Sequence, residues 1–278
     1  MKTSLAAGLM AALLPLAAAA ATPAPDWRPL DPAETLVIDT TKGRIVVEMA
    51  PQVAPQAVAR VKLLAKEGVY DGLQFHRVIA GFVAQTGNPG NQDGGASDHP
   101  DLPPEFTFRL TPEIARGVAF VTAASDARTG FLGSLPISAV SGGEEARARN
   151  GRVLAWGAYC AGVFGMGRQA DPGTANSEIF VMLDSARRLD RDYTPFGRVI
   201  AGFDVAQALA VGEPPETPDQ MIRVALAANL PAAERPSLEV ADARGALFQA
   251  KVAALRTEKG ADFTLCDVEI PVRGHPTP

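Results

Sequence analysis

The sequence predicts a mainly β fold, an antiparallel barrel that is closed or nearly closed, and two observations support this prediction. First, short β-type runs recur along the chain: LQFHRVI, GVAFV, GRVLAWG, EIFVML and TPFGRVI. Second, only one clear helical pattern occurs early in the chain, so the regular alternation of strands and helices that builds a parallel sheet is missing. The chain has 278 residues and 47% hydrophobic residues, which is enough for a large core.

The first predicted elements are a β-hairpin and a helix. Residues 35–49 read TLVIDTTKGRIVVEM, two β-branched runs on either side of Thr41-Lys42-Gly43, which is typical of a hairpin. Apolar residues then recur with helical spacing from Ala57 to Ala65. Gly68 follows them and is expected to end the helix.

Two later segments have a different composition. Residues 125–150 are rich in Gly, Ser, Ala and charged residues, and we interpret them as a surface loop inserted into the barrel. Residues 229–278 form a C-terminal extension. In it, Asp242 is expected to cap a helix, and Phe263–Val272 alternates like an edge strand. About 50 residues bury too little surface to fold alone, so we expect the extension to pack on the barrel.

The N-terminus resembles a secretory signal. Lys2 is followed by an apolar stretch and by an alanine run that ends at Ala21, the pattern of a cleaved signal peptide. A retained anchor is the alternative, but the apolar part is shorter than the roughly 20 residues a spanning helix needs. We expect residues 1–21 to be removed, residues 22–34 to form a proline-rich lead, and the mature protein to lie in a bacterial periplasm, away from the membrane.

An oxidising periplasm would allow the two cysteines, Cys160 and Cys266, to pair. The sequence leaves open whether they do. Neither the cysteines nor the three histidines have the spacing of a zinc site, and no G-x-S-x-G is present. We therefore expect no metal, no cofactor and no serine hydrolase.

Charge and motif patterns exclude further classes. Lys and Arg total 26 against 31 Asp and Glu, with no basic run, so nucleic acid is not an expected partner. Residues Gly165–Ala170 match a dinucleotide-binding fingerprint in letters, but Asp171-Pro172-Gly173 breaks the helix that should follow. Small soluble partners or other proteins are the remaining expectation.

The segment Tyr70–Gly95 carries the most chemical information. A predicted strand presents Arg77, and after a turn at Gly81 come Phe82, Val83 and Gln85. This spacing brings a cation, an aromatic ring and an amide close together. The alternative is a surface arginine that happens to lie beside a core phenylalanine.

The same segment resembles the cyclophilin pattern FHRxxxGFxxQxGDP, with Asn88 at the usual Asp position. Further matches follow in the family's order. They are Gly94-Gly95, Glu105-Phe106, MGRQADPGTANSEIFV (166–181) and LDRDYTPFGRVIAGFDV (189–205). The resemblance covers residues 35–228, which we treat as one isomerase domain.

This resemblance implies an eight-stranded barrel capped by helices, with a proline-binding groove on its outer face. It implies that Arg77 is the catalytic cation and that Gln85 bonds the client backbone. It places Gly167 and Arg168 beside the residue before proline, and Tyr193 where many members have histidine. The proline pocket would be lined by Phe82, Val83, Phe180 and Leu189. For His76, a structural role directed away from the groove is preferred over a catalytic one.

The implied activity is peptidyl-prolyl cis/trans isomerisation, which assists the folding of exported proteins. Rotation about an X-Pro bond has a barrier of ~20 kcal/mol. At the twisted midpoint the imide nitrogen becomes basic, so a nearby guanidinium can donate a hydrogen bond that the planar ground state cannot accept. We expect a monomer that acts on proline-containing polypeptides. A peptide-binding chaperone with little turnover is the alternative function, and a structural envelope protein is a third.

Four positions qualify the resemblance. Glu178 stands where the family commonly has glutamine, and Gly167 where alanine is usual. Arg188 stands where members that bind cyclosporin strongly have tryptophan. The motif FHRVIAGF of residues 75–82 is echoed by FGRVIAGF at 196–203, which makes Arg198 a counterpart of Arg77. Because no glutamine stands three places after the second motif, Arg198 is expected to serve stability.

Overall fold

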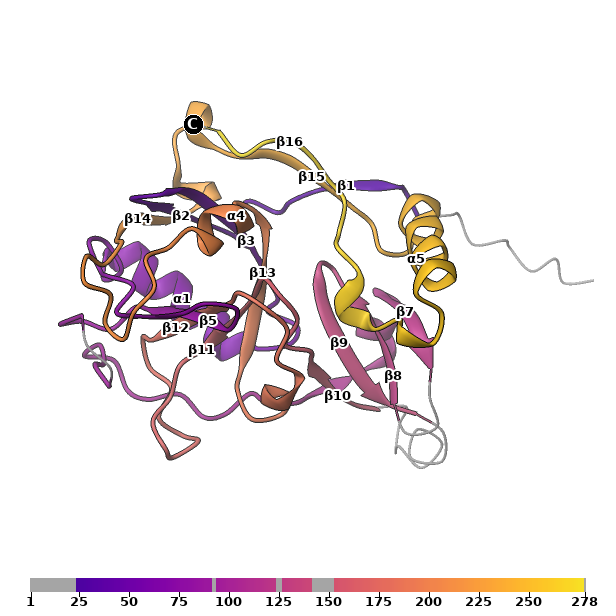
Figure 1. Ribbon diagram of the computed structural model, residues 1–278, viewed down its shortest axis with the longest axis horizontal. Helices are drawn as coiled ribbons and strands as arrows, with labels where there is room; N and C mark the ends of the chain where they lie inside the picture. The colour runs from indigo at the N-terminus through magenta and orange to yellow at the C-terminus, as the bar shows by residue number, and fades with distance from the viewer. Residues whose placement is uncertain (1–23, 92–93, 124–126, 142–152, 278) are drawn as a thin grey trace, which may run out of the picture.

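The computed structural model describes residues 24–91, 94–123, 127–141 and 153–277, so the predicted signal peptide lies outside the described residues. Within them the chain is mainly β, as expected. Figure 1 shows a large curled sheet with α1 (Pro55–Glu67) beside it, a second sheet further along, and a C-terminal part that runs across both.

The large sheet has eight antiparallel strands, as expected. In spatial order they are β14 (Met221–Leu226), β2 (Thr35–Thr40), β3 (Gly43–Met49), β13 (Pro195–Ala201), β11 (Val163–Met166), β12 (Ile179–Met182), β5 (Val83–Thr86) and β4 (Arg77–Ile79). The outer strands β14 and β4 are not joined by a continuous ladder. Isolated bridges link Gln74 to Gln220 and Val78 to Gly212. The sheet is therefore a curled half-barrel, and full closure is not confirmed.

The predicted hairpin and helix are both present. Thr40 pairs with Gly43 at the turn between β2 and β3. The helix α1 ends at Gly68, which is left-handed with a φ of 71°. The buried face of α1, including Val61 and Leu64, lies in the main core with the inward side chains of the sheet. The apolar spacing of residues 57–65 thus did predict the face that the helix buries.

The second sheet corrects the expectation of a surface loop at 125–150. Residues 127–132 and 135–140 are strands β8 (Ala127–Leu132) and β9 (Leu135–Val140), and Ile137 in β9 is fully buried. They belong to a five-stranded sheet in the order β6 (Phe108–Leu110), β10 (Val153–Gly157), β9, β8 and β7 (Val118–Ala123). The small residues are needed for close packing, since a side chain on Gly130 would lie 2.7 Å from Cα of Phe120. Residues 142–150 lie outside the described part.

The C-terminal extension forms a third sheet and a helix. Strand β15 (Ser237–Ala241) pairs with β1 (Trp27–Pro29) and β16 (Val272–His275). Helix α5 (Ala246–Lys259) packs Phe248 edge-on against Phe131 of the five-stranded sheet, with ring centroids 5.3 Å apart. Leu238 and Val240 of β15 pack against Val46 and Ile200 of the half-barrel. The extension therefore packs against both larger sheets.

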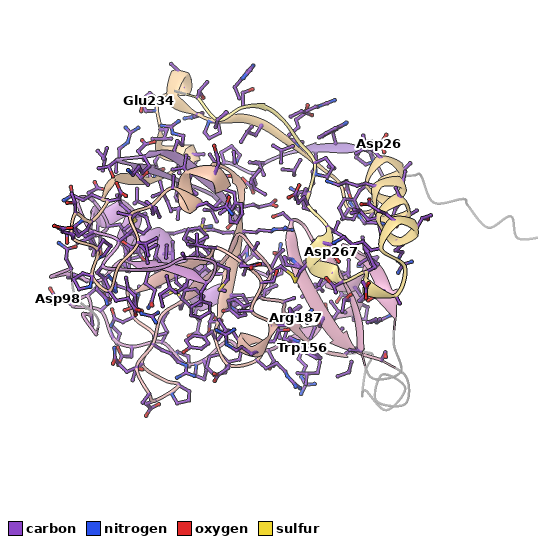
Figure 2. The ribbon with its side chains drawn as sticks, viewed as in Figure 1. Asp26, Asp98, Trp156, Arg187, Glu234 and Asp267 are labelled. Carbon is purple, nitrogen blue, oxygen red and sulfur yellow. A yellow bond between two sulfur atoms is a disulfide. The ribbon has the colours of Figure 1, made fainter. Side chains whose placement is uncertain are left out.

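Two details of the extension differ from expectation. Gly245, not Asp242, is the N-cap of α5. The Leu247 N–H donates a hydrogen bond to the carboxylate of Asp26 at 2.9 Å. Figure 2 shows Asp26 at the top of α5 and Asp267 beside its lower part. The expected strand at 263–272 is also wrong. That stretch holds one 3₁₀ turn, Leu265–Asp267, in which Thr264 and Asp267 form a capping box, and a strand begins only at Val272. Side-chain capping outweighs the alternating pattern there.

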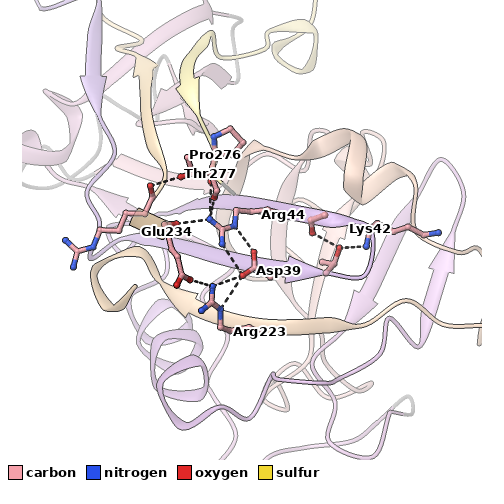
Figure 3. Close-up of polar contacts among 10 residues, drawn as sticks. Asp39, Lys42, Arg44, Arg223, Glu234, Pro276 and Thr277 are labelled. Carbon is pink, nitrogen blue, oxygen red and sulfur yellow. Dashed lines mark hydrogen bonds and ion pairs between the residues drawn. The ribbon is translucent and has the colours of Figure 1, made fainter. Parts of the chain in front are cut away.

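Two further links fasten the extension. A disulfide joins Cys160 to Cys266, so the pairing that the sequence left open is present. At the opposite end, the buried guanidinium of Arg44 donates to the backbone carbonyl of Glu234 at 2.8 Å and to the carbonyl of Thr277 (Figure 3). Asp39 holds the same guanidinium at 2.6 Å.

Arg198 lies beneath the extension. It is buried in β13, with 7% of its surface exposed, and donates to the carbonyls of Ser134 and Val268 at 3.4 Å. Burial lowers the pKa of Arg198 to about 10, although the charge of Glu269 acts in the opposite direction. Arg198 thus joins the half-barrel, the second sheet and the extension.

The remaining elements are short. They are α2 (Pro112–Ala115), α4 (Phe203–Gln207) and 3₁₀ turns at Arg187–Leu189, Ala227–Asn229, Ala232–Glu234, Gly260–Asp262 and Leu265–Asp267. No described helix is long and apolar enough to cross a membrane.

Candidate active site

A row of residues crosses four strands on the outer face of the half-barrel. Arg77 of β4 pairs with Gln85 of β5, Gln85 with Phe180 of β12, and Phe180 with Gly165 of β11. Side chains of directly paired residues lie on the same face of a sheet. Their neighbours in each strand, such as Val78 and Ala84, point into the main core. Strand alternation therefore places the predicted cation and amide side by side.

A pocket of about 320 Å³ lies over this row. Its lining contains every site residue predicted from the sequence, together with Glu178. The lining residues are Arg77, Phe82, Val83, Gln85, Gly167, Arg168, Glu178, Phe180, Leu189 and Tyr193. The sequence therefore named nine residues that the fold brings together from β4, β5 and the turn before it, the residues that follow β11, β12 and the segment around 189–193.

Phe180 forms the apolar floor of the pocket. Its ring stacks on Tyr159 at 5.8 Å and meets Tyr193 edge-on at 5.7 Å. Gly165 leaves the space for this ring, because a side chain there would lie 2.5 Å from Cζ of Phe180. Burial, with the charges of Asp190 and other neighbours, raises the pKa of Tyr159, so its phenol stays neutral beneath the pocket. An aromatic floor of this kind suits a small apolar ring such as proline.

The guanidinium of Arg77 is held from two sides. Its Nε donates to Oε2 of Glu213 at 2.6 Å, and Nη1 donates to Oε1 of Gln85. Glu213 lies in the segment between α4 and β14, which runs beside β4 through the Val78–Gly212 bridge. An arginine has five N–H donors, so other donors of Arg77 remain for a client in the pocket.

A second carboxylate lies below Gln85. Glu178 is buried, with 7% of its surface exposed, and its Oε1 accepts a hydrogen bond from Nε2 of Gln85 at 2.7 Å. Its Oε2 accepts from Nδ2 of Asn88 and lies 3.8 Å from Nε2 of His76. His76 itself is buried and does not line the pocket, in agreement with the structural role preferred for it.

Arg168 and Arg188 lie at the edges of the pocket. Arg168 donates to Asp192 at 2.7 Å, and its guanidinium lies 4.5 Å from the ring centroid of Tyr193. Arg188 is exposed, and its guanidinium lies 4.6 Å from the centroid of Phe82. Arg188 therefore lies against a ring that lines the pocket, at the position where the resemblance put a tryptophan in other members.

Sequence reasoning missed Glu213 and gave Glu178 no place among the site residues. Glu213 is 136 positions from Arg77, and its surroundings, GEPPETPD, read as an ordinary proline-rich turn. The departure from the family's glutamine could have marked Glu178 as a site residue. Its hydrogen-bond partners could not be predicted, because they depend on the pairing of three strands. Among the described residues, no cluster of His, Cys, Asp and Glu has the arrangement of a metal site.

The fold and the site have one combination of features: an aromatic pocket lies beside a guanidinium on the outer face of an eight-stranded half-barrel. Residues 35–227 match the family described as cyclophilin type peptidyl-prolyl cis-trans isomerase/CLD. The chain therefore belongs to the cyclophilin-type peptidyl-prolyl cis-trans isomerase family, and it is an isomerase of that type.

Two of the known relatives match most of the chain, and a third matches a short part of it. The crystal structure of cyclophilin AquaCyp293 from Hirschia baltica is 32% identical, with a TM-score of 0.81, covering 91% of this chain and 94% of that one. A probable peptidyl-prolyl cis-trans isomerase of Brucella suis is 29% identical over 215 residues, which is 72% of this chain and 85% of the relative. A Helicobacter pylori isomerase is 55% identical over 62 residues, 22% of this chain and 38% of the relative.

Proposed function

We propose that Arg77, Phe82 and Gln85 form the catalytic centre of this isomerase, and that its clients are proline-containing segments of exported proteins. The observation that carries the proposal is the direct pairing of Arg77 with Gln85 at the mouth of an aromatic pocket. In this proposal, Phe180 and the residues around it hold the proline ring while the remaining chain turns.

The chemistry follows from the twisted state of the imide. When the X-Pro bond rotates out of plane, resonance is lost and the imide nitrogen gains a lone pair. The donors of Arg77 that are not engaged by Glu213 or Gln85 can then donate to this nitrogen. Because the planar ground state lacks that lone pair, the interaction stabilises the transition state more than the bound client. No nucleophile or general base takes part.

A peptide binder with little turnover is the second candidate. The pairing of Arg77 with a carboxylate, Glu213, is the observation that favours it, because the negative charge of Glu213 partly offsets the attraction of the guanidinium for the imide nitrogen. The two candidates differ in one measurement. A protease-coupled assay of an X-Pro tetrapeptide reports the cis-to-trans rate, which is tens of seconds or slower without a catalyst. An isomerase accelerates it, with loss of the acceleration in R77A, whereas a binder only competes for peptide.

We also propose that the protein works in the periplasm, after removal of residues 1–21. The support is the charged start, apolar stretch and alanine run of this segment. Fractionation of expressing cells followed by intact-mass measurement tests it. We expect a periplasmic protein whose chain begins at or near Thr22; a periplasmic protein that retains residues 1–21, or a cytoplasmic one, would contradict the proposal.

A further inference from the structure

Two departures from the family pattern lie opposite each other in the pocket floor. Gly167 directly follows β11, and Glu178 directly precedes β12. The Gly167 N–H donates a hydrogen bond to the Glu178 carbonyl at 2.8 Å. They therefore extend the antiparallel register that pairs Gly165 with Phe180. Their side-chain positions share the outer face of the sheet, where the pocket lies.

The carboxylate of Glu178 occupies the space that a side chain at position 167 would need. A methyl group on Gly167 would lie 2.5 Å from Cδ of Glu178 and 2.6 Å from its Cγ, and closer still to Oε1. Carbon atoms do not approach this closely, so one side chain would have to move. Gly167 is not among the glycines with positive φ. Space for the Glu178 side chain in its present position, and not backbone conformation, therefore favours glycine here.

Glu178 in turn fixes the orientation of the Gln85 amide. Both carboxylate oxygens of Glu178 accept hydrogen bonds from amide N–H groups, and a guanidinium only donates. Because Glu178 lies on one side of Gln85 and Arg77 on the other, the amide nitrogen must face Glu178 and the oxygen must face Arg77. A glutamine at 178 presents both a donor and an acceptor, so it would leave Arg77 as the only one of the two neighbours that fixes the orientation of the Gln85 amide.

We propose that Gly167 and Glu178 act as a coupled positioning pair. Gly167 makes room for the carboxylate, and the carboxylate holds Gln85 so that its oxygen supports Arg77 and its second N–H is available to a client carbonyl. This inference rests on the catalytic roles proposed for Arg77 and Gln85. The carboxylate is itself held by Asn88 and lies near His76, so it has a defined place in the floor.

A double-mutant cycle tests the coupling. The wild type, G167A, E178Q and G167A/E178Q are compared for kcat and KM in the isomerisation assay and for thermal unfolding. Moving a carboxylate away from the two amide groups that donate to it is harder than moving an amide that must share its donor and acceptor between them. We expect G167A to lower kcat/KM on the order of tenfold when Glu178 is present, but only about twofold in the E178Q background, an interaction within the range seen for residues in contact.

E178Q alone is expected to lower kcat about three- to tenfold with KM almost unchanged, because Gln85 and Arg77 act mainly on the transition state. A loss confined to thermal stability would indicate a merely structural role and would overturn the inference. G173A is the matched control: Gly173 lies six positions away, its φ is not positive, and a methyl group there makes only an ordinary contact with Asp171. It should leave both kcat and KM unchanged.

Equal losses from G167A in both backgrounds would overturn the coupling. If G167A does not fold, the kinetics of E178Q alone test the positioning role of Glu178. A wild-type kcat in E178Q would refute that role. If the wild type itself shows no isomerase activity, the proposed catalytic function fails. The cycle in thermal unfolding still reports in that case whether Gly167 and Glu178 are coupled, so the two failures are distinguishable.

Discussion

Glu213 accepts a hydrogen bond from Nε of Arg77 at 2.6 Å, although 136 positions separate them. Nη1 of the same guanidinium donates to Gln85, so Arg77 is oriented from two directions. The side chain of Glu213 is 54% exposed. Exposed ion pairs contribute about 0–1 kcal/mol, so the contact is suited to orienting Arg77 and adds little to the stability of the fold.

The first prediction concerns this contact. E213A should lower kcat/KM by roughly two- to fivefold, the scale of an exposed pair, because Arg77 loses one of its two anchors. E213Q should stay near wild type, since an amide oxygen still accepts from Nε. Steady-state kinetics of both variants checks this. A loss of similar size in E213Q would mean that the negative charge, and not the orientation, is what matters.

The second prediction separates the two arginines of the repeated motif. R77A should lower kcat/KM by on the order of 10²-fold with an unchanged unfolding temperature, as expected for loss of one preorganised donor. R198A should instead lower the free energy of unfolding by about 1–3 kcal/mol, because it leaves the carbonyls of Ser134 and Val268 without their buried donor. Equal catalytic losses in the two variants would show that the active site is wrongly assigned.

The third prediction concerns the disulfide. Cys160 and Cys266 are 106 residues apart, so their bridge restricts a long loop in the unfolded chain. In the loop-entropy model this is worth up to roughly 4 kcal/mol. Denaturant unfolding of C160A/C266A, compared with wild type with and without reductant, should show this loss. Reductant should not affect the double variant, and an undiminished free energy of unfolding in it would contradict the prediction.

The fourth prediction concerns acid. Burial alone would raise the pKa of Asp39, but hydrogen bonds from Arg44 and Arg223 outweigh it and hold the pKa below its ordinary value of 3.8. A group with a depressed folded pKa stabilises the fold above its unfolded pKa, and this contribution is lost as pH falls through the folded pKa. Unfolding free energies should therefore drop below about pH 4.

In D39N this part of the pH dependence should disappear, so the difference in stability between pH 7 and pH 3 should be smaller than in the wild type. Some dependence should remain, because hydrogen bonds from Arg244 and Lys259 also lower the pKa values of Asp242 and Asp267. An identical pH profile in D39N and wild type would show that the hydrogen bonds of Asp39 with Arg44 and Arg223 do not contribute to acid sensitivity.

The fifth prediction concerns cyclosporin. Arg188 lies over Phe82 where strongly binding members have tryptophan. Arginine offers less apolar surface than an indole and keeps a charge that prefers water. Affinity should be weaker by roughly 2–4 kcal/mol, or about 30- to 1000-fold, and proline turnover should survive. Inhibition assays should show that R188W regains part of the sensitivity; nanomolar inhibition of the unmodified protein would contradict this.

How far the sequence predicted the molecule depended on the range of the interactions involved. The hairpin at 35–49 and the helix that ends at Gly68 were predicted because their signals are local. The strands at 127–140 were interpreted as a loop, because their Gly and Ser content is typical of loops. In the structure the same small residues are needed because the neighbouring strand β7 packs closely. The strand expected at 263–272 failed because local capping overrode alternation.

The sequence by itself determined the family, the mainly β fold and nine pocket residues, because four ordered motifs and strand alternation fix which side chains share a face. Only the tertiary structure decided how those side chains are held. The contact of Glu213 with Arg77, the fit of Glu178 against Gly167 and the bridge from Cys160 to Cys266 each join segments that are distant in the chain. Such contacts depend on how strands pair and pack. Local sequence patterns carry no information about which distant segments come into contact.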